Sequence, residues 1–155
     1  MPPPFTVHFG SRKKTMPARA ELISSLALLA PAAFAATRAR APLAAAHATA
    51  MLVSAALSVV YWSTADRAAL YRDRAAARVR VAADLVALAV ALARDPRGSL
   101  LPMLLAILAL AVYTAKSELK AANGDRRAVS LLHATFHILG AIGEIALVSV
   151  AYAAP

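Results

Sequence analysis

Residues 130–144 read S-L-L-H-A-T-F-H-I-L-G-A-I-G-E and lie inside the last long apolar run of the chain. His133 and His137 are four residues apart, so on a helix they lie on one face, with roughly 6 Å between their β-carbons. Gly140 and Glu144 continue the same stripe. Two imidazoles and a carboxylate on an apolar helix are costly unless they meet partners. The stripe is therefore the first place to look for a functional site.

The composition is that of a membrane protein. The chain has 155 residues, of which 61% are hydrophobic, and its mean hydropathy is +0.63. Soluble domains have about 45–50% apolar residues. The charged residues fall between the apolar runs, as a multi-pass protein requires, so residues 20–155 are expected to form one transmembrane bundle in a lipid bilayer.

Two further features exclude whole classes of function. The chain has no cysteine, which excludes disulfides, iron–sulfur clusters and thiolate zinc sites. The net charge is +9, but the arginines flank apolar segments and form no long basic arm. A nucleic-acid partner is therefore not expected.

The apolar runs predict an all-α, multi-pass transmembrane helical bundle with about five spans. The expected helices cover 20–37, 42–64, 79–94, 99–116 and 128–153. Residues 66–80 are expected to be a polar loop, helical in part. The 79–94 run is short and contains Asp84, so it either spans with its flanking arginines snorkelling or lies in the interface. Residues 1–19 are basic and are expected to be a disordered tail, with a targeting segment as the alternative.

The distribution of basic residues sets the expected orientation. With five spans, one side receives the N-terminal tail and the 66–80 and 116–127 segments, which contain 13 of the 17 lysines and arginines. The other side receives the remaining 4. Basic residues are enriched on the cytoplasmic side of membrane proteins. The sequence therefore predicts an N-terminus inside and a C-terminus outside.

This topology brings several polar residues to one depth. Ser58 lies near the end of the second predicted helix, Asp84 near the start of the third, and His133 and His137 near the start of the last. We therefore expect these four residues to converge in one leaflet. His47 is not expected to join them, because it lies eleven residues before Ser58, about 16 Å along the helix axis.

Such a set could carry zinc chemistry. Two imidazoles four residues apart can hold a divalent metal, usually zinc, with a third ligand from another helix. Asp84 could orient a histidine, ligate the metal or act on a bound water. Ser58 could donate a hydrogen bond to a developing oxyanion.

Each of these residues also has a purely structural interpretation. The histidines could be a hydrogen-bonded pair packed against neighbouring helices, and Ser58 a packing residue. Asp84 could complement the dipole of its helix. Tyr61 and Trp62, at a helix end, suit the membrane interface.

The order of the motifs resembles the CREST superfamily of membrane hydrolases and receptors, which includes alkaline ceramidases, progestin/adiponectin-type receptors and myomaker-like proteins. That family has Ser-x3-His at the end of its second helix, an aspartate in its third and His-x3-His in its last. Ser58, Asp84 and the pair in H-A-T-F-H match these motifs. In that family the motifs imply a zinc held by three histidines, with the aspartate and the serine assisting hydrolysis. Here the resemblance implies His133 and His137 as metal ligands and Ser58 and Asp84 as catalytic residues, with Asp84 as a further ligand where the third histidine is lacking.

The chain also departs from that family. The position four residues after Ser58 is Trp62, so the third histidine is missing. The family has seven spans, against five expected here. The sequence is thus compatible with a zinc-hydrolase-like protein acting on lipid amide or ester bonds, or with an inactive relative of one.

A non-catalytic function is the alternative. The chain would then be an accessory subunit of a larger membrane complex, with other membrane subunits packing against its alanine-rich faces and against Gly140 and Gly143. In that case the histidines could ligate a pigment or a haem iron, or nothing.

Overall fold

The computed structural model describes residues 19–38, 40–64 and 66–153, and the structural statements below concern those residues. They form six α-helices and no strand, which confirms the predicted all-α bundle. The helices are α1 (Arg19–Leu26), α2 (Leu29–Thr37), α3 (Pro42–Thr64), α4 (Arg67–Arg94), α5 (Leu100–Ala121) and α6 (Arg126–Ala151).

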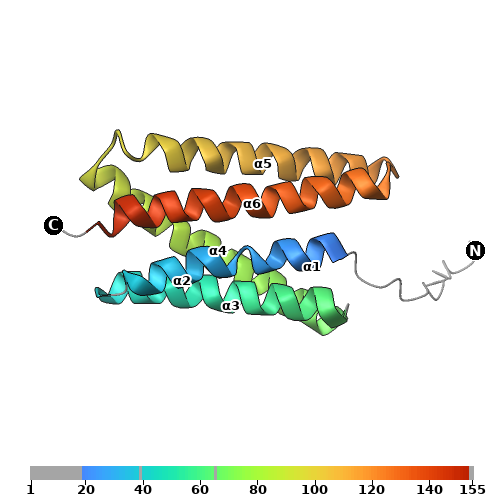
Figure 1. Cartoon of the computed structure of the whole chain (residues 1–155), viewed down its shortest axis with the longest axis horizontal. Coiled ribbons are helices and arrows are strands. Elements are labelled where there is room, and N and C mark those ends of the chain that lie inside the picture. The colour runs from blue at the N-terminus through green and yellow to red at the C-terminus, as the bar shows by residue number, and fades with distance from the viewer. Residues whose placement is uncertain (1–18, 39, 65, 154–155) are drawn as a thin grey trace, which may run out of the picture.

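The first two helices are one broken rod (Figure 1). A single helix was expected over 20–37, but Pro31 has no backbone N–H to donate to the carbonyl of Ala27. The chain instead makes tighter bonds at this point, from Ala27 N to Ser24 O and from Leu28 N to Ser25 O, at 3.1 and 3.2 Å. The five rods therefore correspond to the five predicted helices.

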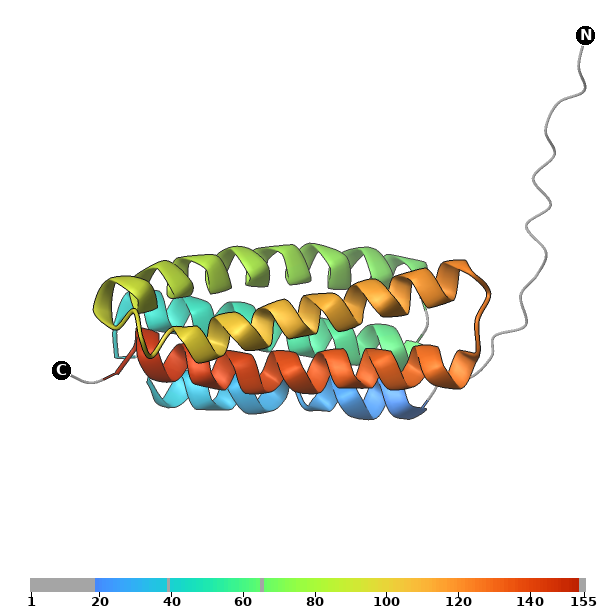
Figure 2. The same ribbon diagram turned by 90° about the horizontal axis from the view of Figure 1, so that it is seen from above.

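Successive rods run in opposite directions, and α6 occupies the centre (Figures 1 and 2). It packs against α1, α2, α4 and α5, whereas among the described helices α5 packs closely only against α6. Most of the α5 surface is consequently exposed and apolar, with Leu100, Leu104 and Ile107 all more than 60% exposed.

The core is built from small residues, which let the helices approach closely. One cluster contains Ala32, Ala35, Ala48, Met51 and Val148, and a second contains Ala87, Ala91, Leu147 and Ala151. On the other side of α6, a β-carbon added to Gly143 would lie 3.3 Å from the β-carbon of Leu105. Gly143 thus marks the close approach of α5 to α6.

Three of the described helices, α3, α5 and α6, are long and apolar enough to cross a membrane. The apolar helical stretch Leu22–Thr37 is shorter. These helices are compatible with an integral membrane protein. The five-span topology stays a prediction.

The helix expected over 79–94 begins earlier than predicted. The segment 66–80, expected to be a polar loop that is helical in part, is helical from Arg67 onward and belongs to α4. The Asp66 carboxylate caps this helix by accepting a hydrogen bond from Ala69 N at 3.2 Å. The alanines and arginines that follow favour helix strongly. Similarly, α5 continues to Ala121, five residues past its predicted end.

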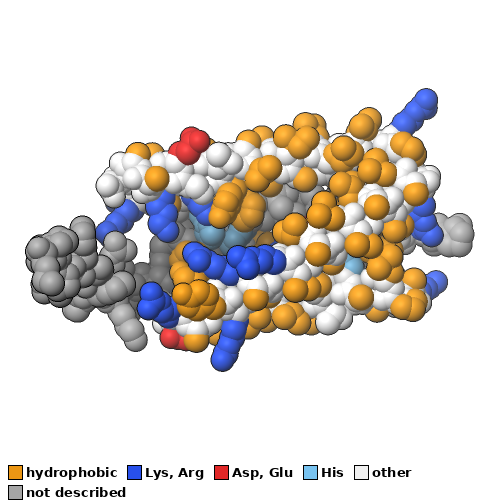
Figure 3. Space-filling model, turned by 180° about the vertical axis from the view of Figure 1, so that it is seen from behind, with side chains coloured by type: hydrophobic (Ala, Val, Ile, Leu, Met, Phe, Trp, Pro, Cys, Tyr) orange, Lys and Arg blue, Asp and Glu red, His pale blue; other side chains and the backbone are white. Residues whose placement is uncertain are grey.

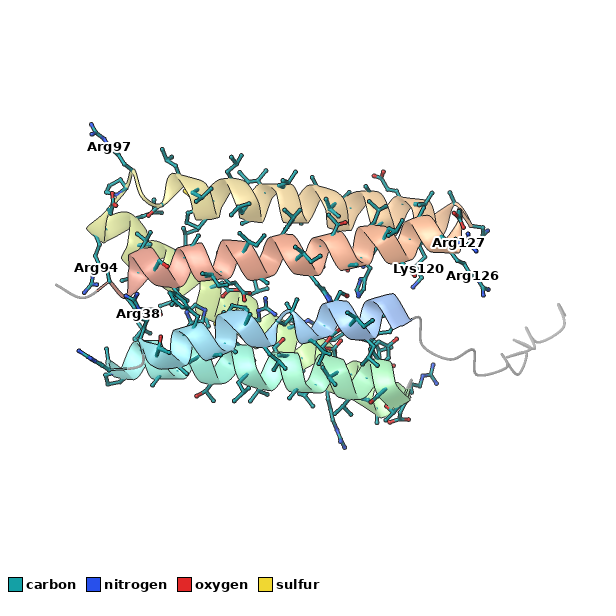
Figure 4. The ribbon with its side chains drawn as sticks, in the orientation of Figure 1. Arg38, Arg94, Arg97, Lys120, Arg126 and Arg127 are labelled. Atoms are coloured by element: carbon teal, nitrogen blue, oxygen red, sulfur yellow. The ribbon has the colours of Figure 1, made fainter. Side chains whose placement is uncertain are left out.

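Many of the basic residues lie at the two ends of the bundle. Arg38, Arg94 and Arg97 lie at one end, and Lys120, Arg126 and Arg127 lie at the other (Figure 4). We call the latter the basic end, because α4 begins there with the arginine-rich segment 67–74; α3 and α5 finish there, and α6 also begins there. The orientation prediction requires these helices to begin and end on the same sides as they do here.

Candidate functional site

The first polar cluster links three helices far from the basic end. Nε2 of His47 on α3 lies 2.8 Å from Oδ1 of Asp84 on α4. Nδ1 of the same ring lies 3.3 Å from the hydroxyl of Tyr152, the residue that follows α6. His47 is only 1% exposed. We call these three residues the His47 cluster.

The partners of His47 indicate its tautomer. A carboxylate only accepts hydrogen bonds, so Nε2 donates to Asp84; in the neutral imidazole, Nδ1 then accepts from the Tyr152 hydroxyl. Burial and the nearby Asp84 carboxylate both raise the pKa of Tyr152, which keeps this hydroxyl protonated. The cluster is thus a carboxylate–imidazole–phenol chain in which the imidazole is satisfied on both sides.

An ion pair lies between the His47 cluster and the basic end. Nε and Nη2 of Arg80 on α4 donate to Oε1 of Glu144 on α6. The two side chains are 14% and 9% exposed. Arg80 had been assigned to a loop on the basic side, but the structure turns it into the bundle. Oε2 of Glu144 is buried without a partner among the described residues.

The second cluster surrounds the His-x3-His motif and lies nearer the basic end. The rings of His133 and His137 are 4.4 Å apart between centroids. Oγ of Ser24 lies 3.2 Å from Nδ1 of His137, and Nζ of Lys116 lies 3.4 Å from Nδ1 of His133. The indole of Trp62 packs on His133, with 5.1 Å between centroids. We call these five residues the histidine cluster.

Ser58 lies on α3 and is buried at the same end of the bundle. Its Oγ is 3.3 Å from Oγ of Ser25, and its hydroxyl lies close enough to the carboxylate of Asp73 on α4 to interact with it. Asp73, not Asp84, is therefore the aspartate beside Ser58. Because Asp84 lies next to His47, it is about 16 Å from Ser58 along the axis of α3.

The expected convergence is thus only partly present. His133 and His137 are together, and Ser58 is tied to α1, but Asp84 belongs to the other cluster. Within the described ranges, no three His, Asp or Glu side chains are grouped so that they could hold a metal ion. Nε2 of His133 is buried without a described partner, as a ligand nitrogen would be, but Trp62 stands beside that ring. Among the described residues, the histidine pair therefore has no third His, Asp or Glu beside it, and zinc binding stays a prediction.

Sequence reasoning missed five residues that the structure puts in these clusters: Ser24, His47, Asp73, Arg80 and Tyr152. The predicted depth of His47 places it apart from Ser58. The predicted 66–80 segment places Arg80 and Asp73 outside the bundle. A signal for Asp73 and His47 is nevertheless present in the lengths of α3 and α4, which set the residues that face each other across their hairpin.

Comparison with known proteins adds no assignment. No protein-family model matches the chain, and no match was found among curated proteins or solved structures. The resemblance to the CREST superfamily therefore stays an expectation from the motifs, and function has to be argued from the geometry above.

Proposed function

We propose that this chain is an integral membrane protein that acts as a non-catalytic subunit of a membrane complex. Its interior is that of a hydrolase-like protein that no longer assembles a zinc site. The contact between Trp62 and His133 carries this proposal. Trp62 is four residues after Ser58, the position of the third histidine in the resembling family, and its indole packs on His133. An indole nitrogen is only a donor and cannot coordinate zinc.

The other candidate catalytic groups are engaged in holding helices together. Asp84 joins α4 to α3 through His47, and Ser58 joins α3 to α1 through Ser25. His137 joins α6 to α1 through Ser24. Interhelical hydrogen bonds of this kind contribute to the stability of membrane bundles. A structural role of the polar interior accounts for all of these contacts without a reaction.

Metal content of the purified full chain tests the proposal. The wild type should hold far less than one zinc per chain, and Trp62→His should bind zinc at least about tenfold more tightly. The gain should disappear when His133→Ala or His137→Ala is added, because the new site needs both imidazoles. Tyr61→His is the matched control, since Tyr61 is adjacent and half-buried but makes ring contact with Trp62 rather than with His133.

Stoichiometric zinc in the wild type would overturn the proposal, above all if the protein also cleaved a fluorescent ceramide or lipid ester. Loss of that zinc on Asp84→Ala would then assign Asp84 to the metal, as the sequence motif suggests. Failure of Trp62→His to gain zinc in a folded protein would reject the assignment of position 62 to a former ligand.

A further inference from the structure

One face of α4 has no partner in the bundle. Along this helix, residues spaced alternately by four and three positions point away from the other helices and define what we call the outer stripe. They are Arg67, Tyr71, Arg74, Arg78, Val81 and Leu85, all of them exposed; the next position, Leu88, is partly buried and packs against the core. Tyr71, Val81 and Leu85 are 61%, 56% and 62% exposed. Spacing of this kind is that of a helix–helix seam.

The outer stripe is divided into two halves. The half nearer the basic end contains three arginines, and the other half contains only aliphatic residues. None of Arg67, Arg74 and Arg78 forms a salt bridge or hydrogen bond with a described side chain. Asp73 acts electrostatically on Arg74, but it is half-buried and also interacts with Ser58. Figure 3 looks onto this side of the molecule and shows Lys and Arg side chains reaching from the end toward its middle.

The depth of Arg78 makes its exposure informative. Its neighbours Ala76 and Val79 line a groove together with Ala50 and Val53 of α3. Val53 is the central residue of α3, eleven positions from either end, or about 16 Å. That distance exceeds the length of an arginine side chain. In a bilayer crossed by α3, Arg78 therefore cannot reach water by snorkelling along its own helix, and an arginine facing lipid is strongly unfavourable.

We propose that the outer stripe binds a transmembrane helix of a different protein, one that carries carboxylates opposite the arginines and aliphatic residues opposite Val81 and Leu85. The proposal rests on the function as a membrane-complex subunit and names the surface and the chemistry of the partner. Charge complementarity selects the occupant. A second copy in parallel would oppose arginine to arginine, and in antiparallel would oppose arginine to the aliphatic half.

A designed peptide provides the probe. The full chain is labelled with a donor dye through Ala121→Cys and placed in phosphatidylcholine vesicles. The peptide is an acceptor-labelled Leu/Val helix that has glutamates at the spacing of Arg67, Arg74 and Arg78. Energy transfer should show that this peptide binds at least about tenfold more tightly than its glutamine counterpart. Arg74→Gln combined with Arg78→Gln should abolish the difference, and Arg72→Gln, an exposed arginine off the stripe, should leave it intact.

A charge reversal separates direct contact from misfolding. Arg78→Glu should weaken binding of the glutamate peptide and create binding of a peptide with lysine at the matching position. Equal binding of the glutamate and glutamine peptides to the wild type would overturn the proposal. Displacement of the glutamate peptide by phosphatidylserine would also overturn it, because the stripe would then bind anionic lipid. Energy transfer between two labelled copies of the chain that is lost on Arg74→Gln would overturn it too, because the stripe would then mediate self-association. Zinc content is measured separately, so failure of the proposed zinc-free site leaves the peptide result interpretable.

Discussion

His47 and Asp84 are bonded because they lie at equal distances from the turn that joins their helices. His47 is seventeen residues before the end of α3, and Asp84 is seventeen residues after the start of α4. Two antiparallel helices joined by a short turn bring such residues to the same depth. Ser58 and Asp73 follow the same rule, each six residues from the turn end of its helix. One hairpin thus produces both α3–α4 polar contacts.

Asp84→Ala should destabilise the bundle. It leaves the Nε2–H of a buried imidazole without an acceptor, and an unsatisfied buried donor costs about 1–3 kcal/mol. The loss would appear as a lower midpoint of thermal unfolding in detergent. Glu118→Ala is the control, because Glu118 is exposed and has no hydrogen-bond partner among the described side chains.

The coupling between the two residues is a sharper measurement. His47→Leu removes the donor that Asp84→Ala leaves unsatisfied, so the double variant should be more stable than the sum of the two single losses predicts. Strict additivity of the two losses would contradict the direct bond.

Arg80→Met should be the most destabilising single change in the polar interior. It leaves the Glu144 carboxylate buried and unpaired, and breaking a buried ion pair costs about 3–5 kcal/mol. Replacing both partners, as Arg80→Met with Glu144→Leu, should recover most of that loss. If Arg80→Met alone were harmless, the pairing of α4 with α6 described above would be wrong.

Much of the fold could be predicted, because hydropathy alone sets the number and order of the rods. The start of α4 could not be predicted in this way. If each apolar run is one helix, the arginine-rich segment between two runs, with arginines at 72, 74, 78 and 80, is expected to be largely a loop. Local propensity decided otherwise: alanine and arginine are strong helix formers, and Asp66 supplies a cap. Because α4 begins at Arg67, Asp84 lies deep in the helix and far from Ser58, not near the helix start as predicted.

The site was harder to predict than the fold. His133 and His137 were recognisable because their spacing fixes a shared face on any helix. The partners of His47 depend instead on pairing between helices, which requires both ends of the α3–α4 hairpin to be known. Arg80 and Glu144 are sixty-four residues apart and meet only because α4 and α6 pack side by side. No local pattern carries that information.

The two glycines of α6 should respond differently to substitution. A β-carbon at Gly143 would lie 3.3 Å from Leu105, whereas a β-carbon at Gly140 meets no other atom within 4 Å. Gly143→Val should therefore push α5 from α6 and lower stability by about 1–3 kcal/mol. Gly140→Ala should raise stability by up to about 1 kcal/mol, because glycine is a poor helix former. Thermal unfolding of both variants, run together, gives the comparison.

The orientation of the bundle gives the last prediction. Cysteines introduced at Ala121, in the last turn of α5, and at Ala153, beyond α6, lie at opposite ends of the bundle. Because the end with Lys120, Arg126 and Arg127 is the basic one, it should face the cytoplasm. A membrane-impermeant maleimide added to intact cells should therefore label Ala153→Cys and spare Ala121→Cys, and permeabilised cells should label both. The chain has no native cysteine to obscure the result. Labelling of both positions in intact cells would mean that α6 does not cross the membrane, and labelling of Ala121→Cys alone would invert the orientation.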